Sequence, residues 1–488
     1  MEKRLFREIS VPLEEIALRS VVVNLWNNTL NSYWLFRDNV IIVGDKIKQR
    51  ILEMVPPLFK NRMISLVMPI GAEILSWRMY HEKNFHGVPE DISSDYLKHL
   101  HWTSKGTIDY KKTAEKLIDL KMFDVTKRYE LACLHCLEDY IPLLWEEVSE
   151  EYKKLLKEEF YSSVDMQLKY YWAYVLKGEE YKFNCIFQTR LPGELSFHQY
   201  AFKVSAVKGN KSAAKFFFQK LSTRERDSSL LFTIYSVLNE RCRSGKKLPD
   251  FPKQNLSDVL CYLLSLMSHE QQMQALKNFP SPILACFLDW PSNDFFLEVA
   301  DVIWTFLPER MYACLLTYMY KVIRTTHVYN PLLFQQFFRQ SPRSFRKEFV
   351  DKECLFGYFF PEFFSMQDIE TIEVIFRNID AADRVRLIFG QHVFKLLCNS
   401  IFTVRWHMVE VLLREAMLSK EDRQRLKKNI LKCMTKTHKG MGVEERTHKR
   451  KWFCVFFDDV CANAAGEENP KDETSTGVKK LCTEKKNN

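Results

Sequence analysis

Two cysteines and a histidine lie close together in the stretch RYELACLHCLEDYIPLLW, residues 128–145, which contains Cys133, His135 and Cys136. Thiolates and imidazoles are ligands that zinc prefers, and a Cys-x-x-Cys pair is also the reactive centre of many redox proteins. A zinc site needs a second ligand pair, but no other Cys-x-x-Cys occurs in the chain. On an uninterrupted helix both cysteines face the core, whereas His135 points about 130° away. We therefore expect buried structural cysteines on a continuous helix.

A second candidate for metal chemistry is HEKNFH, residues 81–86. Its histidines are five residues apart, which places them about 140° apart on a helix, so one metal ion cannot bind both. The chain also lacks the glycine-rich phosphate loops and the G-x-S-x-G nucleophile motif. The sequence thus predicts solvated histidines, no cofactor, no metal and no catalytic site. An enzyme whose residues come together from distant helices stays an alternative.

Positive charge is concentrated near the C-terminal end. The whole chain has a net charge of +9, and residues 420–451 account for +8 of it, with twelve Lys and Arg against four acidic residues. Spacings of three and four residues place several of these cations on one side of a helix. The candidate contacts for an acidic partner are Arg425, Lys428, Lys432, Lys436, Lys439, Lys449, Arg450 and Lys451.

This basic segment, residues 425–451, has two interpretations. It could bind an acidic protein surface, a nucleic-acid backbone or a nuclear-import receptor. It could instead be the charged outer face that keeps a terminal repeat in solution. Aromatic residues that stack on bases would favour single-stranded nucleic acid, but Trp452 and Phe453 belong to an apolar pattern that predicts core positions.

The N-terminal stretch PLEEIALRSV, residues 12–21, follows a short motif. Pro12, Leu13, Ala17 and Val21 occupy the positions that define the elongin-binding box of ubiquitin-ligase substrate adaptors, and the stretch resembles that box. The resemblance implies an adaptor that recruits a ligase through this helix. No clear cullin-contacting segment follows, and an amphipathic helix that begins at a proline is the alternative reading.

The elements that must carry these residues are predicted to be helices. Gly and Pro are scarce, at 14 and 17 residues, whereas 46% of the chain is hydrophobic. Sheets need many glycine-dependent turns, so this composition favours an all-α fold. The apolar runs are too short to span a bilayer, and the N-terminus has no secretory pattern. With 13 scattered cysteines, we expect a protein of the cytoplasm or the nucleus.

A recurring pattern appears towards the C-terminal half. An apolar helix, a short break and a second helix occur in residues 301–316, 336–350, 373–389 and 410–430, with starts 35, 37 and 37 residues apart. Residues 260–279 repeat the break. Such a period is typical of an α-solenoid, in which antiparallel helix hairpins stack on their neighbours. A long helical chain with ordinary loops would give a similar spacing, which is the alternative.

Individual breaks have the residues that begin helices. Ser268 with Gln271, and Ser419 with Asp422, have the spacing of an N-cap and its third helical residue. Residues 198–221 resemble a tetratricopeptide-type hairpin, with small residues on both helices and a turn at Gly209 and Asn210. This resemblance implies a helical hairpin. Ankyrin repeats have a similar length, but their turn motif is absent.

We therefore expect an array of antiparallel hairpins of the tetratricopeptide, HEAT or ankyrin type. The predicted divisions are an irregular helical region at 1–90, hairpins at 91–257, a repeat array with a period of about 37 residues at 258–461, and a disordered polar tail at 462–488. Helical repeats mostly bind other proteins, so the predicted function is a non-catalytic scaffold for a protein or peptide. The ligand and the oligomeric state stay open.

Overall fold

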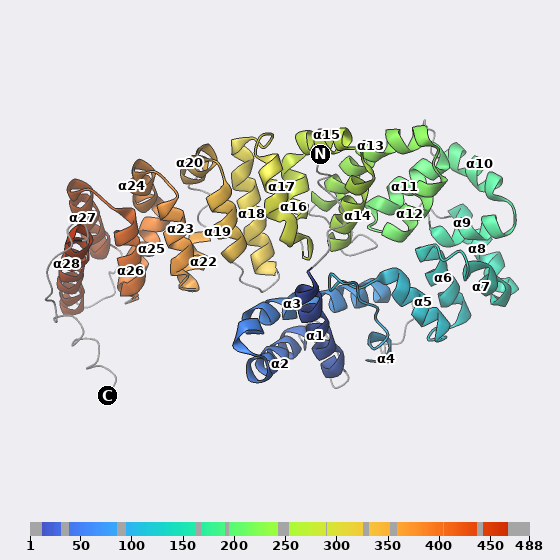
Figure 1. Ribbon diagram of the computed structural model, residues 1–488, viewed down its shortest axis with the longest axis horizontal. Helices are drawn as coiled ribbons and strands as arrows, with labels where there is room; N and C mark the ends of the chain where they lie inside the picture. The colour runs from blue at the N-terminus through green and yellow to red at the C-terminus, as the bar shows by residue number, and fades with distance from the viewer. Residues whose placement is uncertain are drawn as a thin grey trace. The chain divides into compact units, whose positions relative to one another are not determined.

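The computed structural model confirms the all-α prediction for the residues that it describes (Figure 1). Within these residues there is no strand, and the only β-type pairing is an isolated bridge between Trp102 and Ile108. The chain divides into two compact units, unit 1 (Met1–Asn330) and unit 2 (Pro331–Asn488), with the boundary inside the range 258–461. The described residues are 12–30, 39–84, 94–162, 167–190, 195–242, 253–288, 290–325, 331–351, 359–403, 405–436 and 443–466.

The helices of unit 1 lead from α1–α3 through α5–α7, turn back at α8–α10 and return through α11–α18 (Figure 1). Their bounds are α1 (Leu13–Leu30), α2 (Asn39–Met54), α3 (Pro57–Asn84), α4 (Ser94–Leu97), α5 (Tyr110–Asp119), α6 (Val125–His135), α7 (Ile141–Glu147), α8 (Glu150–Ser162), α9 (Leu168–Leu176), α10 (Glu180–Arg190), α11 (Phe197–Val207), α12 (Lys211–Lys220), α13 (Thr223–Cys242), α14 (Lys253–Leu266), α15 (His269–Asn278), α16 (Pro280–Cys286), η1 (Ser292–Phe295), α17 (Phe296–Ile303) and α18 (Glu309–Thr325).

Helices α1, α2 and α3 pack around one tryptophan. The Trp26 side chain is fully buried, and its indole N–H donates to the Val67 carbonyl at 2.9 Å. Glycine at position 71 is required there, because a Cβ atom would overlap the Trp26 ring. Arg62 of α3 binds the carboxylates of Glu14 and Glu15 at the start of α1. The first helix is therefore fixed at both ends.

The C-L-H-C stretch does not lie on one continuous helix. Helix α6 ends at His135, and Cys136 adopts a left-handed conformation with φ of 52°. The Leu137 N–H then bonds the Ala132 carbonyl at 3.0 Å, which closes the helix end, and α7 begins at Ile141. The prediction of one continuous helix was wrong, because Cys136 adopts the left-handed conformation that ends α6 although it is not a glycine.

Burial in this stretch agrees with a structural role for the cysteines. Cys133 and Cys136 are buried as predicted, but His135 is buried too, with 1% of its surface exposed, so its expected outward orientation was wrong. Burial raises the pKa of the Cys136 thiol to about 12 and that of Cys133 well above its ordinary value. A thiol with a raised pKa is a weak nucleophile, which agrees with a structural role for both cysteines.

The hairpin expected at residues 198–221 is present as α11 and α12. Gly209 has φ of +81°, and the Asn210 side chain caps α12 by accepting from the Ala213 N–H at 3.0 Å. Its amide nitrogen also donates to the Leu134 carbonyl at 2.7 Å, which attaches the hairpin to α6. The residues expected between the two helices are all fully buried, namely Ala201, Ala206, Ala214 and Phe217.

Unit 2 contains a regular spacing of helix starts. Its described helices are α19 (Pro331–Gln340), α20 (Arg343–Asp351), α22 (Phe359–Ser365), α23 (Ile369–Arg377), α24 (Ala381–Phe389), α25 (Gln391–Phe402), α26 (Trp406–Ala416), α27 (Lys420–Lys436) and α28 (Val443–Gly466). Helices α19, α23, α26 and α28 begin 38, 37 and 37 residues apart, and each packs against the next of this series. Similarly, α20 packs on α24, and α22, α25 and α27 pack in succession.

Two intervals of this spacing hold three described helices each, α19, α20 and α22 in one and α23, α24 and α25 in the next, and not the two that the sequence predicted. In the second of these intervals, the additional boundary is at Gly390, which ends α24 and begins α25 with no loop between them. Helix α28 also continues to Gly466, so residues 462–466 of the predicted tail are helical. Residues 467–488 lie outside the described part of the chain.

Polar contacts between helices in unit 2 join residues about one interval apart. The buried Gln335 amide donates to the Thr371 hydroxyl at 2.8 Å, and Arg343 Nε donates to the Asp380 carboxylate at 2.8 Å.

The helix starts predicted at Ser268 and Ser419 are confirmed. Ser268 forms a full capping box with Gln271, and the Ser419 hydroxyl accepts from the Asp422 N–H at 3.1 Å.

Candidate functional site

Helix α27 separates its apolar residues from its cations. Leu426, Ile430 and Met434 recur at a spacing of four residues and are buried. The Ser419 hydroxyl and the acidic residues that follow it stabilise the start of this helix. With the apolar side packed on the protein, the lysines between these positions lie on the exposed sides of α27.

Helix α28 packs beside α27 and supplies the second wall of a groove. Phe453 and Phe457 of α28 are buried. Lys427 of α27 reaches across, and its ammonium group lies 2.6 and 2.7 Å from the two carboxylate oxygens of Asp458. The buried phenylalanines hold α28 against the protein, and the exposed ion pair adds a polar contact between the two helices.

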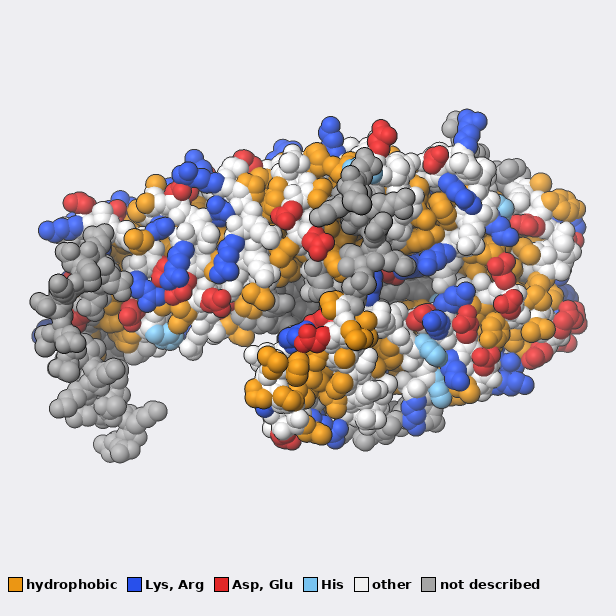
Figure 2. Space-filling view, in the orientation of Figure 1, with side chains coloured by type: hydrophobic (Ala, Val, Ile, Leu, Met, Phe, Trp, Pro, Cys, Tyr) orange, Lys and Arg blue, Asp and Glu red, His pale blue; other side chains and the backbone are white. Residues whose placement is uncertain are grey.

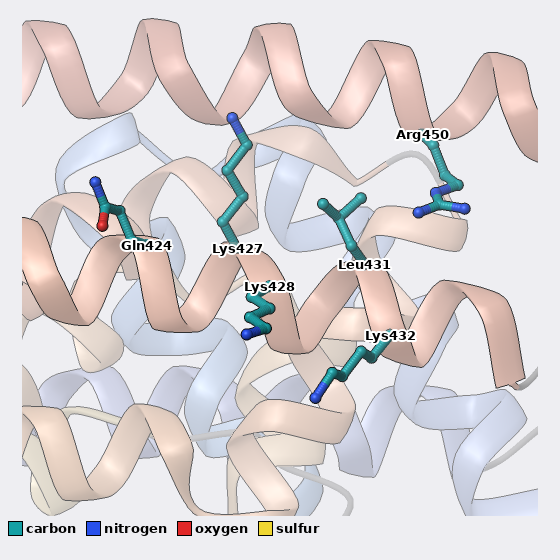
Figure 3. Close-up of a pocket in the computed structure, with 6 residues that line it drawn as sticks. All are labelled: Gln424, Lys427, Lys428, Leu431, Lys432 and Arg450. Atoms are coloured by element: carbon teal, nitrogen blue, oxygen red, sulfur yellow. The ribbon is translucent and has the colours of Figure 1, made fainter.

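The basic groove between α27 and α28 has a volume of about 420 Å³. Figure 3 shows Lys427, Gln424 and Leu431 directed from α27 towards α28, with Arg450 directed from α28 towards α27. Lys428 and Lys432 extend from the other side of α27. The residues that line the groove are Gln424, Lys427, Lys428, Leu431, Lys432 and Arg450.

Three of the predicted contact residues, Lys428, Lys432 and Arg450, line the basic groove. Arg425 does not, because its guanidinium lies over the Phe389 ring at 4.0 Å and 3.7 Å from the Asp422 carboxylate. Lys451 is exposed on α28 but is not part of the lining. The side chains of Lys436 and Lys449, and the whole of Lys439, lie outside the described part of the structure.

Sequence reasoning missed Lys427, Gln424 and Leu431. The predicted contacts were cations spaced three or four residues apart along one side of the helix, beginning at Arg425. Lys427 lies about 200° around the helix from Arg425 and so was not included. The signal that could have found Lys427 was the Asp458–Asp459 pair at the end of an otherwise apolar pattern, because such a carboxylate favours a lysine on the neighbouring helix.

Trp452 differs from its predicted core position. It is 45% exposed, whereas Phe453 is buried as expected. Arg450 and Trp452 are two residues apart on α28 and so point about 200° apart, which directs the tryptophan away from the groove. The groove lining therefore combines cations with an aliphatic side chain and includes no aromatic ring.

The electrostatics of the groove favour negatively charged groups. Four cationic side chains line it, and the carboxylate of Asp458 offsets one of them through Lys427. Ammonium and guanidinium groups bind carboxylates and phosphates by charge-assisted hydrogen bonds. In the described part of the chain, no three His, Cys, Asp or Glu residues are grouped so that they could hold a metal ion. The residues 81–86, with the two histidines, have no described side chains.

A second surface lies on α1, in the stretch PLEEIALRSV. Leu13 is 82% exposed and Val21 is 46% exposed, and Ala17 between them is exposed as well. Their spacing of four residues places all three on one side of α1, opposite the buried Val22 and Trp26. Figure 2 shows hydrophobic side chains gathered over the α1–α3 part of unit 1. Exposed apolar residues of α2 and its end are Ile41, Ile42, Leu52 and Met54.

Similarity to known proteins adds no assignment to these surfaces. No protein-family model matches the chain, and no curated protein is significantly similar to it. Among the described helices, none has both the length and the apolar composition needed to cross a membrane.

Proposed function

We propose that this chain is a non-catalytic binding protein of the helical-repeat type, and that the basic groove between α27 and α28 binds an acidic segment of a partner protein. The observation that carries the proposal is that Lys427, Lys428 and Lys432 of α27 and Arg450 of α28 all line one groove. Such a site attracts carboxylates at long range and holds them by charge-assisted contacts.

The proposed repeat arrangement rests on the spacing within unit 2. Helices α19, α23, α26 and α28 begin at intervals of 37 or 38 residues and pack in that order. Each of them buries apolar residues against its neighbours in the series, which is how a helical solenoid obtains a continuous core. The basic groove would then lie at the last interval of the array.

An acidic peptide fits the groove better than a nucleic acid does. Leu431 lies among the cations, so the lining offers an apolar contact for an aliphatic side chain of the ligand. A single-stranded nucleic acid would gain from stacking, but Trp452 points away from the groove. The groove has a volume of about 420 Å³, which is enough to hold a few residues of a peptide.

The test uses the full chain and a fluorescein-labelled peptide that combines Glu and Asp residues with one Leu. We expect the double variant Lys428→Glu/Lys432→Glu to weaken binding at least tenfold, measured by fluorescence anisotropy. The matched control is Lys420→Glu/Lys451→Glu, which makes the same change in charge at two exposed lysines outside the lining. Equal losses in both variants, or tighter binding of duplex DNA than of peptide, would refute the proposal.

A second candidate function is recruitment of a ubiquitin ligase through α1. It is favoured by the exposure of Leu13, Ala17 and Val21, the residues that match the elongin-binding box. These side chains are available to enter an apolar pocket of a partner, while the opposite side of α1 packs on α2 and α3.

Co-elution of the full chain with purified elongin B–elongin C on a gel-filtration column tests this candidate. Leu13→Arg should abolish co-elution, whereas Leu52→Arg, at another exposed leucine of the same region, should not. If the unaltered protein elutes separately from the elongins at micromolar concentration, this candidate is wrong.

A further inference from the structure

Helices α25 and α27 pack on one another, and each contributes a cysteine to the contact between them. Cys398 of α25 is only 2% exposed. Cys433 of α27 is partly exposed and lies between the buried Ile430 and Met434, at the edge of the apolar side of the helix. Both residues are free thiols in the structure, and the two thiol groups are hydrogen-bonded to one another.

The two thiols of this pair differ in their access to solvent. Burial, and then the hydrogen bond with Cys433, raises the pKa of the Cys398 thiol well above its ordinary value, so Cys398 keeps its proton and donates it to Cys433. Cys433 is the sulfur atom that solvent can reach. An oxidant dissolved in water therefore meets Cys433 first, with the Cys398 S–H group directly beside it. This is the arrangement of an attacking thiol and a resolving thiol.

Cys133 and Cys136 of the C-L-H-C stretch provide a comparison within the same chain. These two cysteines are close in sequence, but both are buried, and burial raises the pKa of each thiol. Thiol oxidation begins at a thiolate that the oxidant can reach. We therefore expect Cys133 and Cys136 to stay reduced under conditions in which Cys433 reacts.

A bond between Cys398 and Cys433 would join helices of two successive intervals in unit 2. The two cysteines are 35 positions apart, and α26 lies between them in the chain. The bond would therefore enclose α26 in a covalent loop, which restricts the unfolded chain and stabilises the fold. The sulfur atoms have to approach to about 2.05 Å, which requires rotation of both side chains about their Cα–Cβ bonds.

We propose that Cys398 and Cys433 form a reversible disulfide when the chain meets a low-molecular-weight disulfide such as oxidised glutathione. The Cys433 thiolate attacks one sulfur of the oxidant and displaces one glutathione, which leaves a mixed disulfide at Cys433. Cys398 then loses its proton and attacks the Cys433 sulfur, and the second glutathione leaves. This attack is intramolecular, which offsets the small thiolate fraction of Cys398. Two protein thiols are oxidised, and one oxidised glutathione is reduced to two glutathiones that take up the two protons.

The experiment incubates the folded full chain with oxidised glutathione, alkylates the remaining thiols under denaturing conditions and identifies the modified peptides by mass spectrometry. We expect a linked Cys398–Cys433 peptide in most molecules, its loss after treatment with dithiothreitol, and alkylated Cys133 and Cys136. If Cys433 stays reduced, ends as a stable mixed disulfide, or is linked mainly to a cysteine other than Cys398, the proposal is overturned.

Two serine variants separate the roles of the two thiols. Cys398→Ser should stop the reaction at the mixed disulfide, so that glutathione accumulates on Cys433, whereas Cys433→Ser should leave Cys398 as a free thiol. The matched control is Cys454→Ser, at a partly exposed cysteine of the neighbouring α28, and it should form the Cys398–Cys433 bond as the unaltered protein does. A Cys398→Ser variant with native helix content and no accumulation of glutathione on Cys433 would refute the assignment of Cys398 as the resolving thiol.

Discussion

Arg377 of α23 donates two hydrogen bonds to Glu415 of α26, from Nε at 2.7 Å and from Nη2 at 2.8 Å. The two residues are 38 positions apart, which is one interval of the helix spacing in unit 2. Arg414 adds a bond to Glu415 at 3.1 Å and one to Glu373 at 2.7 Å. Because the Glu415 side chain is largely buried, these arginines stabilise a charge with little access to water.

We expect Glu415→Gln to lower the free energy of unfolding by about 1–3 kcal/mol at pH 7. Burial raises the pKa of Glu415, but the hydrogen bonds from Arg377 and Arg414 outweigh it and lower that pKa. The contribution is therefore present above the ordinary carboxyl pKa and is lost as the pH falls through the lowered value. Urea denaturation at neutral and acidic pH should show the two proteins converging in acid. The exposed Glu370→Gln is the control, and an equal loss there would contradict the account.

Asp458→Asn should increase the affinity of the basic groove for an acidic peptide. The substitution removes the carboxylate that binds Lys427 and so leaves this lysine available to the ligand. An exposed ion pair is worth about 0.5–1 kcal/mol, which predicts a two- to fivefold tighter complex in the anisotropy assay. Asp459→Asn makes the same charge change one position along α28. If both substitutions act equally, only net charge matters and Lys427 has no specific role.

Stability should fall with rising pH because of Glu73. Burial raises the pKa of this carboxyl from 4.5 to about 7, although the Ile108 N–H donates to it. Protonation therefore favours the folded state, with a contribution that is complete below pH 4.5 and is lost as the pH rises to 7. Glu73→Gln should thus become more stable than the unaltered protein above pH 7, by an amount on the order of 3 kcal/mol.

Chemical denaturation at several pH values between 5 and 8 measures this effect. The control is Glu270→Gln, which makes the same substitution at an exposed position. A difference between Glu73→Gln and the unaltered protein that does not grow between pH 5 and pH 7 would exclude a buried neutral carboxyl at this position.

Two glycines allow backbone strain to be separated from packing. Gly106 and Gly178 both have positive φ, at +78° and +69°. Alanine at Gly178 would meet nothing within 4 Å, whereas at Gly106 its Cβ would lie 3.1 Å from Trp290. We expect Gly178→Ala to cost about 1 kcal/mol and Gly106→Ala to cost at least 1 kcal/mol more, in thermal or urea denaturation. Equal costs would mean that the Trp290 contact adds nothing.

The all-α fold and many helix boundaries followed from the sequence for local reasons. Ser268 and Ser419 begin helices because their hydroxyls accept from the backbone three residues later. The burial of Leu426 and Ile430 follows from a spacing that matches the helical turn. In such cases the residues near one position are enough to determine its structure.

Other features could not be predicted because they depend on contacts between distant residues. Arg425 and Lys428 lie on the same side of the predicted helix, so the sequence does not distinguish them. In the structure the Arg425 guanidinium packs on the Phe389 ring of another helix and does not line the groove. The end of α6 at Cys136 was missed because only glycine or asparagine usually signals a left-handed cap.

The regular starts of α19, α23, α26 and α28 limit how this part of the chain can change length. Each of these helices packs against the one that begins 37 or 38 residues later. Duplication or loss of one whole interval would preserve the packing between the helices on either side of it. An insertion or deletion of any other size within a helix would turn its buried side chains away from the neighbouring helix. Changes in the length of this part of the chain should therefore occur in multiples of one interval.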